Sequence, residues 1–396
     1  MRKQTIHDID VRSRRVLVRA DYNVPQDTDG AIADDTRIRA TLPTIRYLQE
    51  RGARILLCSH LGRPGGRVAE DLRLAPVARR LAELLGQSVR ALTDCIGPDV
   101  EDAALEMEKG EVVLLENLRF HPGEKANDPA FAEQLARPAE IFVNDAFGAC
   151  HRAHASVVGV PQHLPAVAGM LLHKELDTFT AVLEDPGKPF AMVSGGAKVS
   201  DKLGVLDNII TTVDVLLIGG GMAATFLKSR GHAVGASAVE VDHLDRVRRL
   251  EEKAASRSVH LVLPRDVVIA ESLDADAPPR TVPVSEIPDG WIIADIGPAA
   301  TEDFAREIAR CRTVIWNGPM GVFEHPQFAE GTRRIAAALA SLDGTAVIGG
   351  GSTAEAVAAF GYADRMSHVS TGGGATLTLL AGQPLPGVEA LLDAEA

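Results

Sequence analysis

The stretch VDVLLIGG at residues 213–220 is a short apolar run that ends in glycine, and it decides the fold class. After Asp214 the run is continuously apolar rather than alternating, which is typical of a strand buried on both faces of a parallel sheet. Helical patterns such as LAPVARRLAELLG (74–86) and DHLDRVRRLEEKAA (242–255) separate similar runs elsewhere. Strands that alternate with helices predict an α/β fold built from βαβ units. The other predicted strands are 14–21, 54–60, 111–120, 140–147, 189–195, 291–297, 313–318 and 345–351.

The chain of 396 residues is long enough for two or three domains. MLLHKELDTFTAVLED (170–185) has the pattern of one long helix, and the PGKP segment at 186–189 ends it. Because a new strand begins at Phe190, two α/β domains joined by a helix are the simplest account. The predicted divisions are an N-terminal domain (1–169), a hinge helix (170–188) and a C-terminal domain (189–375).

Composition excludes several classes of protein. Apolar residues make up 46% of the chain, which is too many for a disordered protein. The net charge of −13 argues against a general binder of nucleic acid or anionic membranes, so any anion site must be built locally. The N-terminus has no apolar run after its positive charges, and no stretch has the roughly 20 apolar residues of a membrane span. We therefore expect a cytoplasmic protein.

The cysteines predict neither a zinc site nor a disulfide framework, because they are far apart and form no CxxC pair. Cys150 lies beside His151, but adjacent residues rarely orient each other as a nucleophile and base, so a plain small residue is the favoured interpretation. The four cysteines are Cys58, Cys95, Cys150 and Cys311.

The two halves differ in the residues at the ends of their strands, where parallel α/β sheets bind ligands. First-half strands end in charge and imidazole, as in RAD (19–21), SHLGR (59–63), NLRFH (117–121) and ND (144–145). Second-half strands end in glycine, and 24 of the 36 glycines lie in residues 186–396. Arginine clamps carboxylates and phosphates, whereas glycine lets backbone N–H groups approach phosphates. The pattern predicts a small polyanion in the first half, a nucleotide in the second, and group transfer between them.

Three motifs have alternative interpretations. GGGMAA (219–224) fits a dinucleotide fingerprint, but it lies in mid-chain without a second strand ending in a ribose-binding acid. SGGAKVSDK (194–202) predicts a helix start with Lys198 and Lys202 on one face, which either hold an anion or are simply solvated. CHRAHAS (150–156) is either a ligand loop or a surface loop. The P-loop and protein-kinase signatures do not occur in the sequence.

Eight ordered motifs together resemble the phosphoglycerate kinase family, from residue 19 to residue 375. They are RADYNVP (19–25), SHLGRP (59–64), LENLRFH (115–121), HRAHAS (151–156), GGAKVSDK (195–202), DIGP (295–298), WNGPMGVFE (316–324) and STGGGA (370–375).

The resemblance implies two Rossmann-like domains hinged by a helix, with the tail (376–396) returning to the N-terminal domain. It implies a reversible, Mg²⁺-dependent transfer of a phosphoryl group from 1,3-bisphosphoglycerate to ADP, giving 3-phosphoglycerate and ATP, with domain closure. It also implies a cytoplasmic monomer whose partners are these small molecules. The transition state of such a transfer is loose, so positioning and electrostatics dominate, and His151 is not required as a base.

The resemblance also implies a role for individual residues. The substrate would be bound by Asp21, Tyr22, Asn23, Arg37, His60, Leu61, Gly62, Arg63, Arg119 and Arg152. The nucleotide would be bound by Lys202, Gly297, Glu324, Gly350, Gly351, Ser352 and Thr353. The residues expected to act on the transferred group are Arg37, Lys198, Lys202 and Gly351.

One departure from the family concerns the metal. The family normally has an aspartate where this chain has Ser352, and a hydroxyl is a poorer Mg²⁺ ligand than a carboxylate. We expect Mg²⁺ to be held by nucleotide phosphates and water, with no metal-ligating residue assigned. Two alternatives stay open at this point: another kinase of small acids, and a nucleotide-binding protein without catalysis. Tyr22 stands where phenylalanine is usual, as a packing variant.

Overall fold

The computed structural model describes residues 2–273 and 278–394 in two compact units. Unit 1 contains the chain up to Asp177 together with the segment from Pro384 onward. Unit 2 contains Thr178–Gln383. Among the described residues, no helix has both the length and the apolar composition needed to cross a membrane.

Unit 1 is built on a six-stranded sheet whose neighbouring strands are all parallel, with the order β3-β4-β2-β1-β5-β6. This confirms the predicted α/β class. The strands are β1 (Arg15–Arg19), β2 (Arg54–Cys58), β3 (Arg90–Ala91), β4 (Val112–Leu114), β5 (Ile141–Asn144) and β6 (Ala166–Ala168). The helices are α1 (Thr36–Glu50), α2 (Ala75–Leu85), α3 (Pro98–Glu106), α4 (Pro122–Ala126), α5 (Pro129–Ala136) and α14 (Pro386–Glu389).

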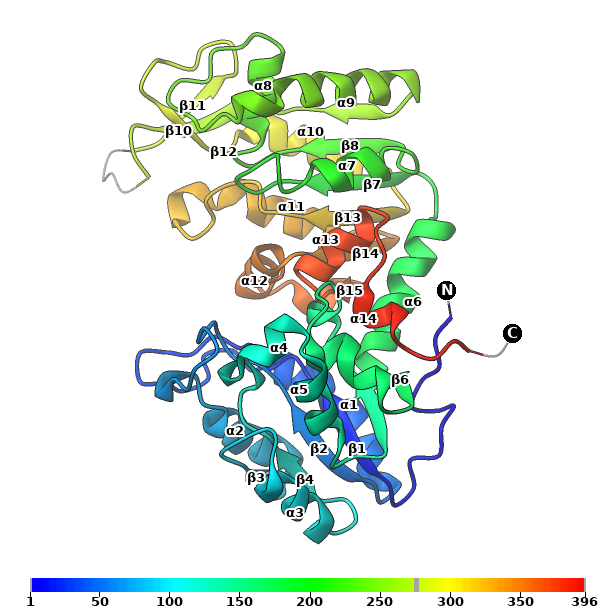
Figure 1. Ribbon diagram of the computed structural model, residues 1–396. Coiled ribbons are helices and arrows are strands. Elements are labelled where there is room, and N and C mark those ends of the chain that lie inside the picture. Colours follow the sequence, from blue (N-terminus) through cyan, green and yellow to red (C-terminus); the bar gives the residue numbers. More distant parts are fainter. Residues whose placement is uncertain (1, 274–277, 395–396) are drawn as a thin grey trace. The chain divides into compact units, whose positions relative to one another are not determined.

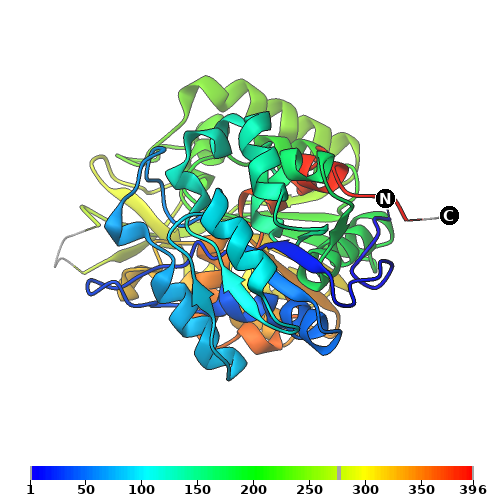
Figure 2. The same ribbon diagram turned by 60° about the horizontal axis from the view of Figure 1, so that its bottom comes forward.

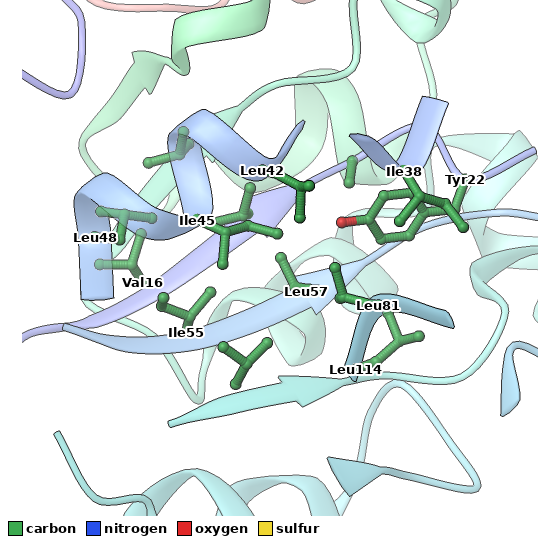
Figure 3. Packing of buried hydrophobic residues seen from close by; sticks show 14 of the residues in the cluster. Val16, Tyr22, Ile38, Leu42, Ile45, Leu48, Ile55, Leu57, Leu81 and Leu114 are labelled. Carbon is green, nitrogen blue, oxygen red and sulfur yellow. The ribbon is translucent and has the colours of Figure 1, made fainter. Parts of the chain in front are cut away.

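Helix α1 holds the central strands of this sheet in place. Its buried residues recur at helical spacing and form one apolar face, which packs on side chains of β1 and β2 (Figure 3). Because this core fixes β1 and β2, the residues that follow them start from well-defined positions. The packed residues include Ile38, Leu42, Ile45 and Leu48 from α1 with Val16, Ile55 and Leu57 from the strands.

Unit 2 is built on a second all-parallel sheet of six strands, with the order β15-β14-β13-β7-β8-β9. The strands are β7 (Phe190–Ser194), β8 (Val215–Ile218), β9 (His260–Val262), β13 (Thr313–Asn317), β14 (Thr345–Gly349) and β15 (His368–Val369). The helices are α7 (Leu203–Ile209), α8 (Ala223–Ser229), α9 (Leu244–Ser256), α10 (Pro298–Ile308), α11 (Glu330–Ala340), α12 (Gly351–Ala359) and α13 (Gly374–Leu380).

The prediction that the strand at 291–297 belongs to a parallel sheet is wrong. β12 (Ile292–Ile296) pairs antiparallel with β10 (Asp266–Ala270), which in turn pairs antiparallel with β11 (Arg280–Pro283). Ile293 lies in one apolar cluster and Ala294 in another, so both faces of β12 are covered. A continuous apolar run therefore indicates that both faces of a strand are buried, but it does not indicate whether the strand pairs parallel or antiparallel.

Helix α6 (Met170–Glu184) contains the division between the two units, which falls after Asp177 (Figure 1). Its first turn is fixed by unit 1. Asp145 Oδ1 accepts hydrogen bonds from the backbone N–H groups of Leu171 (2.9 Å) and Leu172 (3.2 Å), and Thr44 Oγ1 accepts one from Met170 N (2.9 Å). These acceptors satisfy donors that an α-helix leaves free at its start.

The first and last described segments of the chain run side by side in unit 1 (Figure 1 and Figure 2). Gln4 N donates to Leu392 O at 2.8 Å, and Lys3 Nζ pairs with Asp393 Oδ1 at 2.7 Å. Gly387 N donates to Cys150 O at 2.9 Å, so α14 is tied to the loop that follows β5. The predicted tail is divided, because residues 376–383 belong to unit 2.

Candidate functional site

Four neighbouring strands of unit 1 carry the charged residues at their carboxyl ends. Arg19 is the last residue of β1 and Asp21 follows it, while His60 follows β2. Arg119 lies in a 3-10 turn after β4, and Arg152 lies in the loop after β5. Because β4, β2, β1 and β5 are adjacent and parallel, their ends lie along one edge of the sheet.

Asp21 is the centre of a buried ionic cluster. Arg37 Nη1 donates to Asp21 Oδ2, and Arg19 Nη2 lies 3.0 Å from His60 Nδ1. Burial pushes the pKa of Asp21 upward, but the charges of Arg37, His60 and Arg19 hold it below its usual value. The structure therefore brings together Asp21, Arg37 and His60, three of the residues that the resemblance names.

Arg119 is a cation without a full complement of partners. Its Nη1 donates to Gly62 O at 2.7 Å, but its buried Nε has no hydrogen-bond partner among the described residues. Burial, followed by the charges of Arg152 and Arg19, lowers the pKa of Arg119 to about 10. An anion bound here would satisfy the free donor and relieve the repulsion between the cations.

Gly62 shapes the loop between Asn23 and Arg119. Its N–H donates to Asn23 Oδ1 at 2.8 Å, and its φ is +63°, which favours glycine. A Cβ there would also come within 2.6 Å of Leu72 Cδ2. Arg63, the next residue, is exposed and makes no hydrogen bond or ion pair with the described residues.

Two predicted substrate contacts do not have available side chains. The Tyr22 hydroxyl lies 2.9 Å from Thr41 Oγ1. Figure 3 shows the Tyr22 ring among the side chains of the core. Leu61 is 2% exposed and belongs to the same apolar cluster. Apolar burial and not ligand contact therefore explains both side chains, and their backbone N–H groups donate to Ser59 Oγ and Asn117 Oδ1 within the protein. The interpretation of Tyr22 as a packing variant agrees with this position.

The sequence motifs contain Arg19, His154 and Ser156 but assign them no role, and they do not point to Glu124. Arg19 is fully buried, and its Nε donates to Ser156 Oγ at 2.9 Å. Ser156 Oγ donates to Glu124 Oε1 at 2.7 Å, and Glu124 is also fully buried. His154 Nδ1 lies 3.7 Å from the same oxygen, and burial with the charges of Arg119 and Arg19 lowers the pKa of His154 to about 4. The HRAHAS segment is thus part of the site and not a simple surface loop.

In unit 2, most of the glycines that follow strands pack against one another. Gly196 N donates to Pro319 O (2.9 Å), and Gly220 N donates to Met320 O (3.1 Å). A Cβ on Gly318 would come within 2.1 Å of Gly195 O. These glycines allow close backbone approach between loops, so their N–H groups are used within the protein.

The loop after β14 is different, because its backbone N–H groups remain free. Gly350 has φ +90° and precedes α12, which begins at Gly351. Among the described residues, no acceptor bonds the N–H of Gly351, Ser352 or Thr353, as expected for the first turn of a helix. The Thr353 hydroxyl is occupied by Gly318 N at 2.7 Å, whereas Ser352 is exposed. This helix start offers donors and a positive dipole end to a phosphate.

The prediction that Lys198 and Lys202 share a helix face is wrong. Helix α7 begins only at Leu203, and the glycine-containing segment before it is irregular. Lys198 is exposed, but Lys202 donates to the buried side chain of Asn317. Burial lowers the pKa of Lys202 to about 8. Asn317 Nδ2, which has no partner among the described residues, lies beside Gly349 and Gly350, about 3.1 Å from where their Cβ atoms would be.

The remaining two predicted nucleotide residues have different surroundings. Gly297 is buried, its N–H donates to Asp266 O at 2.9 Å, and a Cβ there would meet the Asp266 carboxyl at 2.2 Å. Asp266 also accepts from Ala299 N and Ala300 N, so the start of α10 is already capped. Glu324 is exposed.

Metal ligands are scarce where the nucleotide is expected. Residues 349–353 include no carboxylate, and Ser352 has the only side-chain oxygen of this loop that is not already bonded. In unit 1, Asp94, Cys95 and His121 each place one possible ligand atom within 4.8 Å of the others. There, however, His121 Nε2 and Asp94 Oδ1 already form a hydrogen bond of 2.7 Å, which accounts for their proximity.

Comparisons with known proteins identify the family of this chain. The family model for phosphoglycerate kinase matches residues 6–383. The phosphoglycerate kinase of Moorella thermoacetica is 54% identical over 393 residues, covering 99% of this chain and all of the relative. That of Acaryochloris marina is 54% identical over 401 residues, with both chains fully covered.

Solved structures agree as well. The phosphoglycerate kinase of Coxiella burnetii has a TM-score of 0.87 at 39% identity, and that of Pyrococcus horikoshii has the same score at 32% identity. Each comparison covers 98% of both chains. The chain therefore belongs to the phosphoglycerate kinase family and is an enzyme, a glycolytic kinase that transfers a phosphoryl group.

Proposed function

We propose that the cationic cluster of unit 1 binds the phosphate and carboxylate groups of 3-phosphoglycerate and 1,3-bisphosphoglycerate. The observation that supports this most strongly is the excess of buried positive charge around Arg119, whose Nε lacks a partner among the described residues. In a chain with a net charge of −13, such a concentration of cations needs a local anion. The substrate-binding residues are those predicted above, with Tyr22 and Leu61 supporting the site by packing in the core beneath it.

We propose that the start of α12 and Lys202 bind the phosphates of ADP and ATP. The free N–H groups of Gly351, Ser352 and Thr353 suit phosphate oxygens. Lys202 supplies a positive charge, and its contact with Asn317 holds it toward the glycine loop. Gly297 and Glu324 remain proposed contacts of the nucleoside, and Lys198 a second cation for the transferred group.

The chemistry needs positioning more than proton transfer. The acceptor oxygen of 3-phosphoglycerate or ADP is already anionic, so no general base is required. Arg37 and Lys202 would stabilise charge on the transferred group, each contributing on the order of 3–4 kcal/mol to the transition state. Because each unit binds one ligand, transfer requires the units to bring the ligands together, and this closure would also exclude water from the acyl phosphate.

Mg²⁺ would enter with the nucleotide. The loop at 349–353 supplies hydroxyl and backbone groups in place of a carboxylate, and such groups bind a hard cation more weakly. We therefore propose that phosphates and water provide most of its ligands. We also propose a monomer in the cytoplasm, a location that the free thiols of the four cysteines support.

Arg37→Ala tests the site assignment. Loss of this guanidinium should lower kcat for 3-phosphoglycerate, ATP and Mg²⁺ by roughly 10²–10³-fold. The matched control is Arg39→Ala, because Arg39 lies on the same helix but pairs with Asp35 on the exposed side. Thermal unfolding of both variants separates lost chemistry from lost folding. A rate for Arg37→Ala within a few-fold of the control would refute the assignment.

A further inference from the structure

We propose that Arg19 is a positioning residue that holds His60 as the neutral tautomer with its proton on Nε2. The inference rests on the proposed function, since His60 is assigned to the substrate site, but the tautomer itself belongs to the free protein. It makes His60 a neutral hydrogen-bond donor among the cations that surround the substrate.

The distances around His60 Nδ1 decide between two proton positions. Arg19 Nη2 lies 3.0 Å from Nδ1, which is a hydrogen-bond distance, whereas Asp21 Oδ1 lies 3.8 Å away, which is not. A guanidinium has donors only and stays charged in proteins. His60 Nδ1 must therefore accept, so the proton of the neutral ring lies on Nε2.

Arg19 is itself fixed on its other side. Its Nε donates to Ser156 Oγ at 2.9 Å, and Ser156 is held in turn by Glu124, whose oxygens accept from Ser156 Oγ at 2.7 Å and Ser156 N at 2.9 Å. Arg19, Ser156 and Glu124 are all fully buried. Arg19 therefore cannot turn away from His60 without leaving buried polar groups unpaired, which is costly.

The groups that face His60 also disfavour its charged form. Burial lowers the pKa of His60, and the positive charges of Arg19, Arg119 and Arg37 lower it further, while Asp21 acts in the opposite direction. Among the described residues, no group hydrogen-bonds His60 Nε2. This N–H is the donor that remains for the substrate.

Nitrogen-15 NMR of the unliganded, uniformly labelled full-length chain tests the tautomer. The His60 signals are assigned by their loss in His60→Gln. We expect a protonated Nε2 and an unprotonated Nδ1 from about pH 8 down to about pH 5, where an ordinary histidine would become charged. A proton on Nδ1, or a doubly protonated ring at pH 7, would overturn the proposal. Because no substrate is present, this result does not depend on the proposed function.

Two variants assign the effect to Arg19. Arg19→Lys keeps a group with donors only and should preserve the Nε2–H tautomer, whereas Arg19→Met removes the donor and should allow both tautomers. In Arg19→Met the KM for 3-phosphoglycerate should rise about tenfold, with a smaller change in kcat. An unaltered His60 spectrum in Arg19→Met would show that Arg19 does not set the tautomer. If this variant does not fold, the spectrum of the unchanged chain still decides which nitrogen of His60 carries the proton, and loss of the Nε2–H tautomer in Arg19→Lys would overturn the role of Arg19.

Discussion

Lys202 should give the enzyme an alkaline limit near pH 8. An ordinary lysine ammonium has a pKa of 10.5, but burial lowers that of Lys202 to about 8. This lowering of the pKa corresponds to a charging cost on the order of 3 kcal/mol in the free protein. The amine is charged below pH 8 and neutral above it, and only the ammonium can neutralise a phosphoryl group.

The assay is the pH dependence of kcat/KM for ADP, which reports the ionisation of the free enzyme. We expect a plateau up to about pH 7 and a tenfold fall per pH unit above about pH 8. At pH 9.5 the value should be about 30-fold below the plateau, since only about one lysine in 30 is then charged. The phosphate groups of the substrates have their second pKa near 6, so they do not produce this limb.

Lys202→Arg is the matched control for this limb. Arginine keeps its charge throughout the accessible pH range, so the fall above pH 8 should disappear even if the rate is reduced. A plateau that extends to pH 10 in the unchanged enzyme would refute the reasoning. So would an alkaline limb that persists in Lys202→Arg.

Two further predictions concern unit 2. Ser352→Asp adds a carboxylate to the loop before α12 and should lower the Mg²⁺ concentration for half-maximal activity; an unchanged Mg²⁺ titration would contradict it. Burial raises the pKa of Asp295 to about 7, while its oxygens accept from Gly331 N and Ile296 N. Since the folded pKa exceeds the unfolded one, the stability from this group is present below about pH 4 and is lost as pH rises through 7. Denaturant unfolding should show that the free energy of unfolding falls by an amount on the order of 3 kcal/mol from about pH 5 to pH 8.5, and that this fall is absent in Asp295→Asn. An equal pH dependence of the free energy of unfolding in both proteins would contradict the prediction.

The sequence was sufficient to predict the inner strands of the two parallel sheets, because burial on both faces requires continuous apolar runs. It did not predict the short edge strands β3, β6, β9 and β15. It was insufficient for β12, whose run has the same composition but pairs antiparallel with β10. It also placed Lys198 and Lys202 on one helix, since four-residue spacing has that meaning only inside a helix, and α7 starts at Leu203. Strand partners and helix boundaries depend on contacts with distant residues that spacing does not encode.

The residues of the candidate site also separate into those that the sequence indicates and those that it does not. The family resemblance names Arg37 and His60, and both lie beside Asp21. The roles of Glu124 and Ser156 could not be predicted, because a buried carboxylate in a short helix has no sequence signal until the arginine that faces it is known. The motifs thus identify the groups that would face a ligand. The proton positions and orientations of those groups are set by the buried residues behind them, which only the folded chain brings together.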